Sequence, residues 1–231
     1  MFKQFYDEAS STLTYLIADE NSKQTALIDP VAENIDEYLS VIKQHHLNLV
    51  YSLETHVHAD HITGGSKLKM ITMAKTGVSK DCGANAADIQ LTDNDVITLG
   101  NEKITVIATP GHTAGSVSFL WQDRLFTGDS LLINGCGRTD FQSGDAGKLY
   151  DSITTKLFTL AGETIVYPGH DYHGRRISTI AQEKLINPRL AGKSKDAFID
   201  IMQNLNLPKP RLIDIAVPAN KKCGMTEAQQ G

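Results

Sequence analysis

The sequence lacks the features of disulfide-stabilised, membrane and exported proteins. Only 3 of its 231 residues are cysteine, and Cys82, Cys136 and Cys223 have no Cys-x-x-Cys spacing, which favours a reducing compartment. No apolar run approaches the roughly 20 residues of a membrane-spanning helix. Residues 1–10 have neither the apolar core of a signal peptide nor an Arg-rich amphipathic start. These absences predict a soluble, unprocessed, cytoplasmic protein.

A long basic run is also absent. The chain has 22 Lys and Arg against 27 Asp and Glu, a formal net charge of -5, which argues against nucleic acid or an anionic membrane as the main partner. A chain with 41% hydrophobic residues can bury a large core, so it needs no metal for stability alone. The predicted partner is a small molecule or a protein, and any metal would serve function first.

Short apolar and β-branched runs predict a layered α/β fold with hairpins in both halves. Helical spacing indicates helices at 32–45, 147–160 and 174–186. Strands are expected at 12–18, 25–29, 47–53, 103–108, 116–121, 124–127 and 164–167. We expect one domain over residues 1–231, with 187–231 as a carboxyl-terminal extension that is irregular at 207–210 and 217–220.

A dense group of ligand-type residues follows the expected strand at 47–53. His56, His58, Asp60 and His61 form the pattern H-x-H-x-D-H. In an extended segment, residues 56, 58 and 60 would point to one side, and the step to 61 would reach round a cation. Imidazole and carboxylate suit zinc, iron or manganese. Incidental histidines in a solvated loop are the alternative, which four such residues in six positions disfavour.

Three later ligand-type residues also follow expected strands. His112, Asp129 and His170 each come directly after Gly or Pro-Gly, the residues of sharp turns that expose a side chain at a strand end. Taken alone, each could be a hydrogen-bonded turn residue. Because strand ends can meet at one edge of a sheet, we expect them to join the first group in one metal site.

Four motifs together resemble a known superfamily. THVHADHITGG, TPGHTAGS, FTGDS and YPGHD resemble the successive metal motifs of the metallo-β-lactamase superfamily, in the same order over residues 55–171. The resemblance implies an αββα four-layer sandwich with its metal at one edge of two facing sheets. A glyoxalase II-like member would be a dinuclear hydrolase of glutathione thioesters. His56, His58 and His112 would bind one metal. Asp60, His61 and His170 would bind the other. Asp129 would bridge the two, and all seven residues are present.

Further stretches resemble the persulfide dioxygenase group more closely. They are FTGDSLLINGCGRTDFQSG, YPGHDYHG, NPRL and NLNLPKPRLIDIAVPANKKCG, so the likeness runs from about residue 50 to residue 224. It implies an oxidoreductase with one ferrous ion, Fe(2+), per chain, which oxidises glutathione persulfide with O2 and water to sulfite and glutathione. Zinc could not replace iron because it is redox-inert. The implied iron ligands are His56, His112 and Asp129, with His58, Asp60, His61 and His170 around them.

The same resemblance suggests substrate contacts and partners. Tyr172 and Arg189 are the candidates for binding glutathione, and Arg138 is either a third or an ion-paired support of the iron loop. Cys136 is either a small buried apolar residue or a persulfide-carrying thiol. A homodimer and a functional link to a rhodanese or a sulfide:quinone oxidoreductase are further implications. The non-enzymatic alternative is a metal-dependent binding module.

Overall fold

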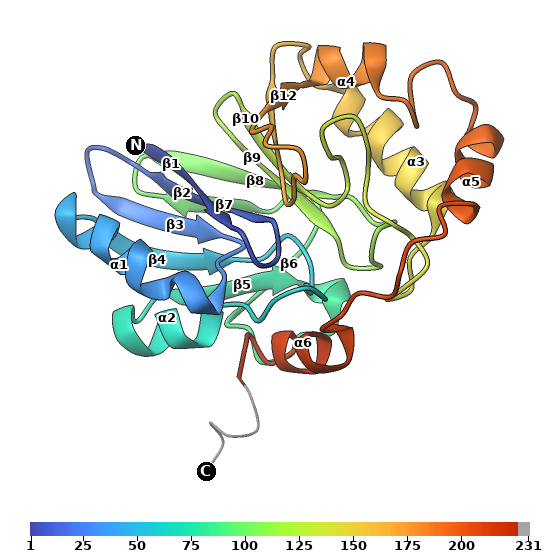
Figure 1. Ribbon diagram of the computed structural model, residues 1–231. Helices are drawn as coiled ribbons and strands as arrows, with labels where there is room; N and C mark the ends of the chain where they lie inside the picture. Colours follow the sequence, from blue (N-terminus) through green and yellow to red (C-terminus); the bar gives the residue numbers. More distant parts are fainter. Residues whose placement is uncertain (226–231) are drawn as a thin grey trace.

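Two six-stranded sheets pack face to face, and helices cover their outer sides (Figure 1). The structure is a computed structural model, and it describes residues 1–225. The first sheet has the order β1 (Phe2–Asp7), β2 (Thr12–Ala18), β3 (Gln24–Ile28), β4 (Asn48–Leu53), β5 (Lys75–Ser79) and β6 (Ile89–Leu91). The second has the order β12 (Ser178–Thr179), β11 (Ile165–Pro168), β10 (Arg124–Gly128), β9 (Val117–Trp121), β8 (Glu102–Ala108) and β7 (Val96–Leu99).

The helices complete the outer layers. On the first sheet lie α1 (Ile35–Gln44) and α2 (Gly65–Thr72), and on the second lie α3 (Ala146–Thr155), α4 (Ile180–Ile186) and α5 (Lys195–Gln203). An extended stretch of chain leads from α5 to α6 (Ile213–Asn220), which lies apart from α3, α4 and α5 in Figure 1. Short 3-10 turns occur at η1 (Ala32–Asn34), η2 (Lys80–Cys82) and η3 (Leu157–Thr159). The αββα order of layers confirms the predicted fold class.

Both sheets mix parallel and antiparallel pairing, as the hairpins predict. Strands β1 to β3 pair antiparallel, whereas β3, β4, β5 and β6 pair parallel. In the second sheet, β7 to β10 pair antiparallel and β10 pairs parallel with β11. Parallel neighbours have their carboxyl ends at the same edge of a sheet, so the loops after β10 and β11 emerge side by side.

Three apolar layers hold the sandwich together. Tyr15, Leu53 and Phe119 belong to the layer between the sheets, where the inner faces of both meet. Strand β2 contributes to two layers, because Leu16 points to the opposite face of the sheet from Tyr15 and packs against α1 and α2. The third layer fills the space between the second sheet and α3, α4 and α5. Alternate burial on both sides explains why every residue of β2 is buried.

Several predicted boundaries are wrong. The helix expected at 147–160 ends at Thr155, where the Thr154 and Thr155 hydroxyls donate to carbonyls one turn earlier, and only the turn η3 follows. The helix expected at 174–186 begins at Ile180. Residues 174–177 form a loop because the Asp171 carboxylate accepts the backbone N–H groups of His173 and Arg175.

The carboxyl-terminal region is more regular than expected. Residues 207–210 are irregular, as predicted, but 217–220 belong to α6, which tolerates Pro218 near its end. Phe198 and Met202 of α5 pack into the third apolar layer. Strands β1, β5, β6, β7 and β12 and helices α2, α5 and α6 were not expected from the sequence. Residues 226–231 of the proposed extension lie outside the described residues, and the single-domain assignment stays a prediction. Over residues 1–225, no helix has the length and apolar character needed to cross a membrane.

Replacing Phe119 by Ala tests the layer between the sheets. Phe119 is completely buried there, so Phe119→Ala should lower the free energy of unfolding by about 3–5 kcal/mol. Denaturant unfolding followed by circular dichroism measures the change. Val96→Ala, on the edge strand β7 where Val96 is 53% exposed, is the control and should change stability by about 0.5 kcal/mol or less. Equal losses in both variants would contradict the packing described here.

Candidate metal centre

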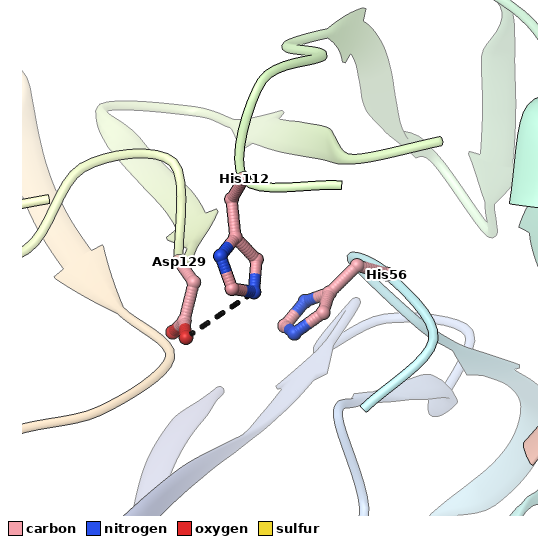
Figure 2. A group of neighbouring side chains, drawn as sticks. All are labelled: His56, His112 and Asp129. Carbon is pink, nitrogen blue, oxygen red and sulfur yellow. Dashed lines mark ion pairs between the residues drawn. The ribbon is translucent and has the colours of Figure 1, made fainter. Parts of the chain in front are cut away.

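The loops after four strands bring the ligand-type residues together. His56 follows β4, His112 follows β8, Asp129 follows β10 and His170 follows β11. His56, His112 and Asp129 each offer one ligand atom, and these atoms lie within 4.8 Å of one another. Figure 2 shows both rings and the carboxylate, from three separate loops, turned toward a common point. The structure therefore joins residues that are up to 73 positions apart in the sequence.

Hydrogen bonds to the Nδ1 atoms orient the two imidazoles. Nδ1 of His112 donates to the Arg138 carbonyl at 2.7 Å, so its Nε2 faces Oδ2 of Asp129 at 3.6 Å. Nδ1 of His56 lies 2.9 Å from the Thr55 hydroxyl. Burial and the neighbouring His58 hold the pKa of His56 well below its ordinary value, which keeps this ring neutral. Each ring therefore presents an Nε2 lone pair, the form that binds metals.

The carboxylate ligand is oriented by His170. Nδ1 of His170 donates to Oδ1 of Asp129 at 2.7 Å, which leaves Oδ2 on the side of His112. Nε2 of the same ring donates to Oδ2 of Asp60 at 3.0 Å. Burial alone would lower the pKa of His170, but the charges of Asp129 and Asp60 outweigh it and raise this pKa well above its ordinary value. His170 is thus a doubly hydrogen-bonded imidazolium between two carboxylates.

Asp60 collects further hydrogen bonds on the same oxygen. Its Oδ2 accepts from the Thr12 hydroxyl at 3.0 Å and lies 2.8 Å from Nδ1 of His61. Burial alone would raise the pKa of Asp60, but His170 and His61 hold it well below its ordinary value. The Thr12 hydroxyl is also 3.2 Å from Nε2 of His170. Ligand atoms of His58, Asp60 and His61 also lie within 4.8 Å of one another, and Oδ2 of Asp60 there is shared by hydrogen bonds from Thr12, His61 and His170.

His58 departs from the expected arrangement. The sequence predicts that residues 56, 58 and 60 point to one side, but residues 54–61 contain no strand, so the alternation does not apply. Nε2 of His58 lies 3.1 Å from Oδ1 of Asp29 and 3.5 Å from Oε2 of Glu54, and all three side chains are buried. Its Nδ1 is 3.9 Å from Asp60. His58 thus has its closest charged contacts with Asp29 and Glu54.

The donor set at the common point fits a divalent transition metal. Two imidazole nitrogens and one carboxylate oxygen are the ligands of a two-histidine, one-carboxylate facial triad, which leaves coordination positions open. The remaining polar atoms of the three side chains are already oriented by Thr55, Arg138 and His170. Such outer hydrogen bonds are what tune and hold metal ligands in proteins.

A cavity of about 600 Å³ opens beside the triad. Its lining includes the predicted substrate residues Arg138, Tyr172 and Arg189, together with Arg175, Arg211 and the carboxylates of Asp60, Asp129 and Asp171. The Tyr172 ring is 66% exposed and lies parallel to the His170 ring, with 6.0 Å between the ring centroids. The cavity therefore presents guanidinium groups and an aromatic face to a bound molecule.

The arginines that line the cavity differ in how they are held. Nε and Nη2 of Arg138 donate to Asp140 at 2.6 and 2.7 Å, and Nη1 donates to the Pro208 carbonyl at 2.6 Å. Arg189 donates from Nη1 to the Cys136 carbonyl at 2.6 Å. Among the described residues, no hydrogen bond from Nε or Nη2 of Arg189 is found. Arg138 is thus used inside the protein, and Arg189 has donors left for a ligand.

Cys136 lies beside Arg189 in an apolar setting. Its side chain is buried in the third apolar layer, and burial raises the pKa of its thiol to about 11. Buried thiols of this kind behave as small apolar residues.

Sequence reasoning missed four residues that shape the site. Asp29, Glu54 and Thr12 contact the histidines and Asp60, and Asn220 binds the loop that carries them. Glu54 directly precedes the first motif, and Asp29 precedes Pro30 at the end of β3, so charged residues after apolar strands were a usable signal. Thr12 gave no signal, because its role depends on the pairing of β2 beside His170.

Comparisons with known proteins place this arrangement in a family. Residues 8–170 match the model of the metallo-beta-lactamase superfamily. With two facing sheets and the triad at their edge, the chain belongs to that superfamily. Within it, the chain belongs to the persulfide dioxygenase family: it is 46% identical over 227 residues to the human protein "Persulfide dioxygenase ETHE1, mitochondrial", covering 97% of this chain and 89% of that protein.

Other relatives agree with this assignment. The crystal structure of ETHE1 from Myxococcus xanthus superposes with a TM-score of 0.96 at 53% identity, covering 97% of this chain and all of that chain. The hydroxyacylglutathione hydrolase of Brucella anthropi is 39% identical over 166 residues, covering 68% of this chain and 60% of that protein. The likeness to the hydrolase thus covers less of this chain than the likeness to the human persulfide dioxygenase.

Two glycines on one loop test the orientation of His112. A Cβ at Gly137 would overlap the Asp129 carbonyl and lie 2.8 Å from Nδ1 of His112, whereas a Cβ at Gly135 would have its nearest neighbour 4.0 Å away. Gly137→Ala should therefore weaken metal binding at least tenfold, measured by titration with Co(2+). Gly135→Ala is the matched control and should bind as wild type. Wild-type affinity in Gly137→Ala would contradict the described geometry.

Proposed function

We propose that this oxidoreductase is a mononuclear non-haem iron enzyme that oxidises glutathione persulfide. The overall reaction combines glutathione persulfide, O2 and H2O to give glutathione and sulfurous acid, which ionises to sulfite. Both atoms of O2 and the oxygen of water end on the terminal sulfur, and glutathione leaves as the thiol. Family membership supports the persulfide dioxygenase activity, and the choice of carrier and metal is our own proposal.

The observation that carries the mononuclear assignment is the position of His170. Both of its ring nitrogens donate to carboxylates, at 2.7 Å to Asp129 and at 3.0 Å to Asp60, so the imidazolium has no lone pair for a second metal. The contacts of His58 with Asp29 and Glu54 also favour a ligand set limited to His56, His112 and Asp129. The glyoxalase II-like alternative needs His58 and His170 as ligands, and their contacts disfavour it.

The proposed metal is ferrous iron, with one ion per chain. Bound by these three side chains, Fe(2+) would offer open positions to a persulfide sulfur and to O2, and would supply the redox chemistry that zinc lacks. The protein contributes the fixed Nε2 atoms, the oriented Asp129 carboxylate and the charge of His170 beside it. His58, Asp60, His61 and His170 act around the ligands by fixing their positions.

The guanidinium groups that line the cavity support glutathione as the carrier. Glutathione has two carboxylates, and guanidinium groups bind carboxylates through planar paired hydrogen bonds. Arg189 has donors left for such a contact, and the exposed ring of Tyr172 offers an adjacent surface. We assign Arg138 to support instead, because its guanidinium joins Asp140 and the 207–208 carbonyls while its own carbonyl orients His112.

The homodimer, the functional link to a rhodanese or a sulfide:quinone oxidoreductase, and the cytoplasmic location stay predictions. The mammalian relatives carry the word mitochondrial in their names. We propose the cytoplasmic location for this chain on its composition alone.

An oxygen electrode separates the two enzymatic candidates. With Fe(2+)-loaded protein, glutathione persulfide should cause O2 uptake and form one sulfite per O2, and S-lactoylglutathione should not be hydrolysed. Heat-inactivated protein corrects for the spontaneous oxidation of the persulfide. Hydrolysis of the thioester without O2 uptake on the persulfide would favour the dinuclear hydrolase and refute this proposal.

Substituting His61 distinguishes one metal from two. His61 is a ligand only in the dinuclear arrangement, so His61→Asn should keep about one iron per chain at saturating iron, while His56→Asn should lose it. Asn at 61 can still donate to Asp60, which limits structural disturbance. Elemental analysis after gel filtration gives the ratio. A fall from two metals to one in His61→Asn would show a dinuclear centre.

Replacing Arg189 tests the glutathione contact. Arg189→Ala should raise KM for glutathione persulfide about tenfold or more with little change in kcat, because a charge-assisted hydrogen bond contributes about 1.5–3 kcal/mol. Steady-state O2 uptake measures both constants. Arg124→Ala, on the strand β10 outside the cavity lining, is the control. Equal loss in kcat and kcat/KM would mean that Arg189 acts on the reaction instead of on substrate binding.

A further inference from the structure

Asn220, the last residue of α6, binds the loop that carries the first metal motif. Its Oδ1 accepts the Thr63 N–H at 2.9 Å, and its Nδ2 donates to the carbonyls of His58 at 3.0 Å and His61 at 2.8 Å. The side chain is buried. Both amide hydrogens and the amide oxygen are therefore used, and all three bonds cross more than 150 residues of sequence.

The loop needs such a partner because its backbone bonds to neighbouring strands are few: Glu54 donates to Gly77 of β5, and Thr55 accepts from Val117 of β9. Residues 54–61 form turns and irregular backbone, and buried backbone groups must find hydrogen bonds somewhere. Asn220 supplies three of them between His58 and Thr63. A helix near the carboxyl end of the chain thus satisfies backbone hydrogen bonds of a loop that lies early in the sequence.

The chain just after α6 strengthens the same contact. The Cys223 carbonyl accepts the N–H of Ser66 at 2.8 Å, at the start of α2. Gly224 has a positive φ of 88°, and a Cβ there would overlap the Thr63 carbonyl, so the turn approaches the loop as closely as backbone allows. Helix α6 and residues 223–224 therefore dock along the whole segment from His58 to Ser66.

We propose that Asn220 is a positioning residue for the metal centre. The carboxyl-terminal helix supplies no candidate ligand, yet through Asn220 it fixes the backbone at His58, His61 and Thr63, just after the ligand His56. This inference rests on metal binding by the triad, as in the proposed function, but not on the identity of the substrate or the reaction. Loss of such outer hydrogen bonds weakens metal binding by about 10–100-fold in other metalloproteins.

Titration of the metal-free protein with Co(2+) tests the proposal without using activity. Asn220→Ala removes all three bonds, and Asn220→Asp keeps the acceptor for Thr63 but loses both donors to the His58 and His61 carbonyls. Both variants should bind Co(2+) about tenfold or more weakly and show an altered visible spectrum when saturated. The control is Asn204→Ala, since Asn204 bonds only within its own helix, to Asp200, and it should bind as wild type.

The Co(2+) affinity of the folded Asn220 variants decides the proposal. Folded Asn220 variants, with wild-type circular dichroism, that bind Co(2+) within twofold of wild type would overturn it. A failure to detect O2 uptake in the wild type would refute the proposed function and leave the Co(2+) result unaffected.

A measurement on the wild type covers the case in which neither variant folds. Saturation with Co(2+) should slow hydrogen exchange of the Thr63 amide, because the metal and Asn220 stabilise the same backbone arrangement. The amide of Ile104 in β8, in the core between the sheets and outside this loop, serves as the reference. An exchange rate of Thr63 that changes no more than that of Ile104 would overturn the proposal.

Discussion

The imidazolium of His170, held between Asp129 and Asp60, is the interaction on which the site depends. The His170 ring is buried, and a buried charge is costly to remove from water unless it is paired and hydrogen-bonded. Here each carboxylate receives one ring N–H, and Asp60 gains Thr12 and His61 as well. The pairing uses one oxygen of Asp129 and leaves the other for a metal. The same hydrogen bonds leave neither ring nitrogen of the His170 imidazolium free to bind a metal.

The fold holds these side chains in place because two rigid sheets meet where the loops emerge. The layer between the sheets fixes β4 of one sheet against β8, β10 and β11 of the other, so side chains from distant segments keep their spacing. On one side of the triad, Asp29 and Glu54 hold His58. On the other side, the Arg138 carbonyl orients His112 while its guanidinium binds the 207–208 carbonyls. The carboxyl-terminal segment therefore supports both the cavity wall and, through Asn220, the first metal motif.

The fold class could be predicted from the sequence, and the resemblance implied the grouping of His56, His112 and Asp129 that the structure contains, but the hydrogen-bond partners of the surrounding residues could not be predicted. Dense His and Asp motifs after apolar strands are readable because strand ends gather at one edge. Apolar periodicity located most long strands, such as Thr12–Ala18 and Asn48–Leu53. It failed where local hydrogen bonds compete with helix, as Asp171 does before α4. It also failed for His58, whose direction depends on Asp29, a contact between loops that no local pattern encodes.

The most direct test of this account is the metal content of protein purified without oxygen, measured by elemental analysis against chain concentration. We predict about one iron per chain at saturation, because both ring nitrogens of His170 donate to carboxylates. Two metal ions per chain, with a second ion on Asp60, His61 and His170, would contradict it.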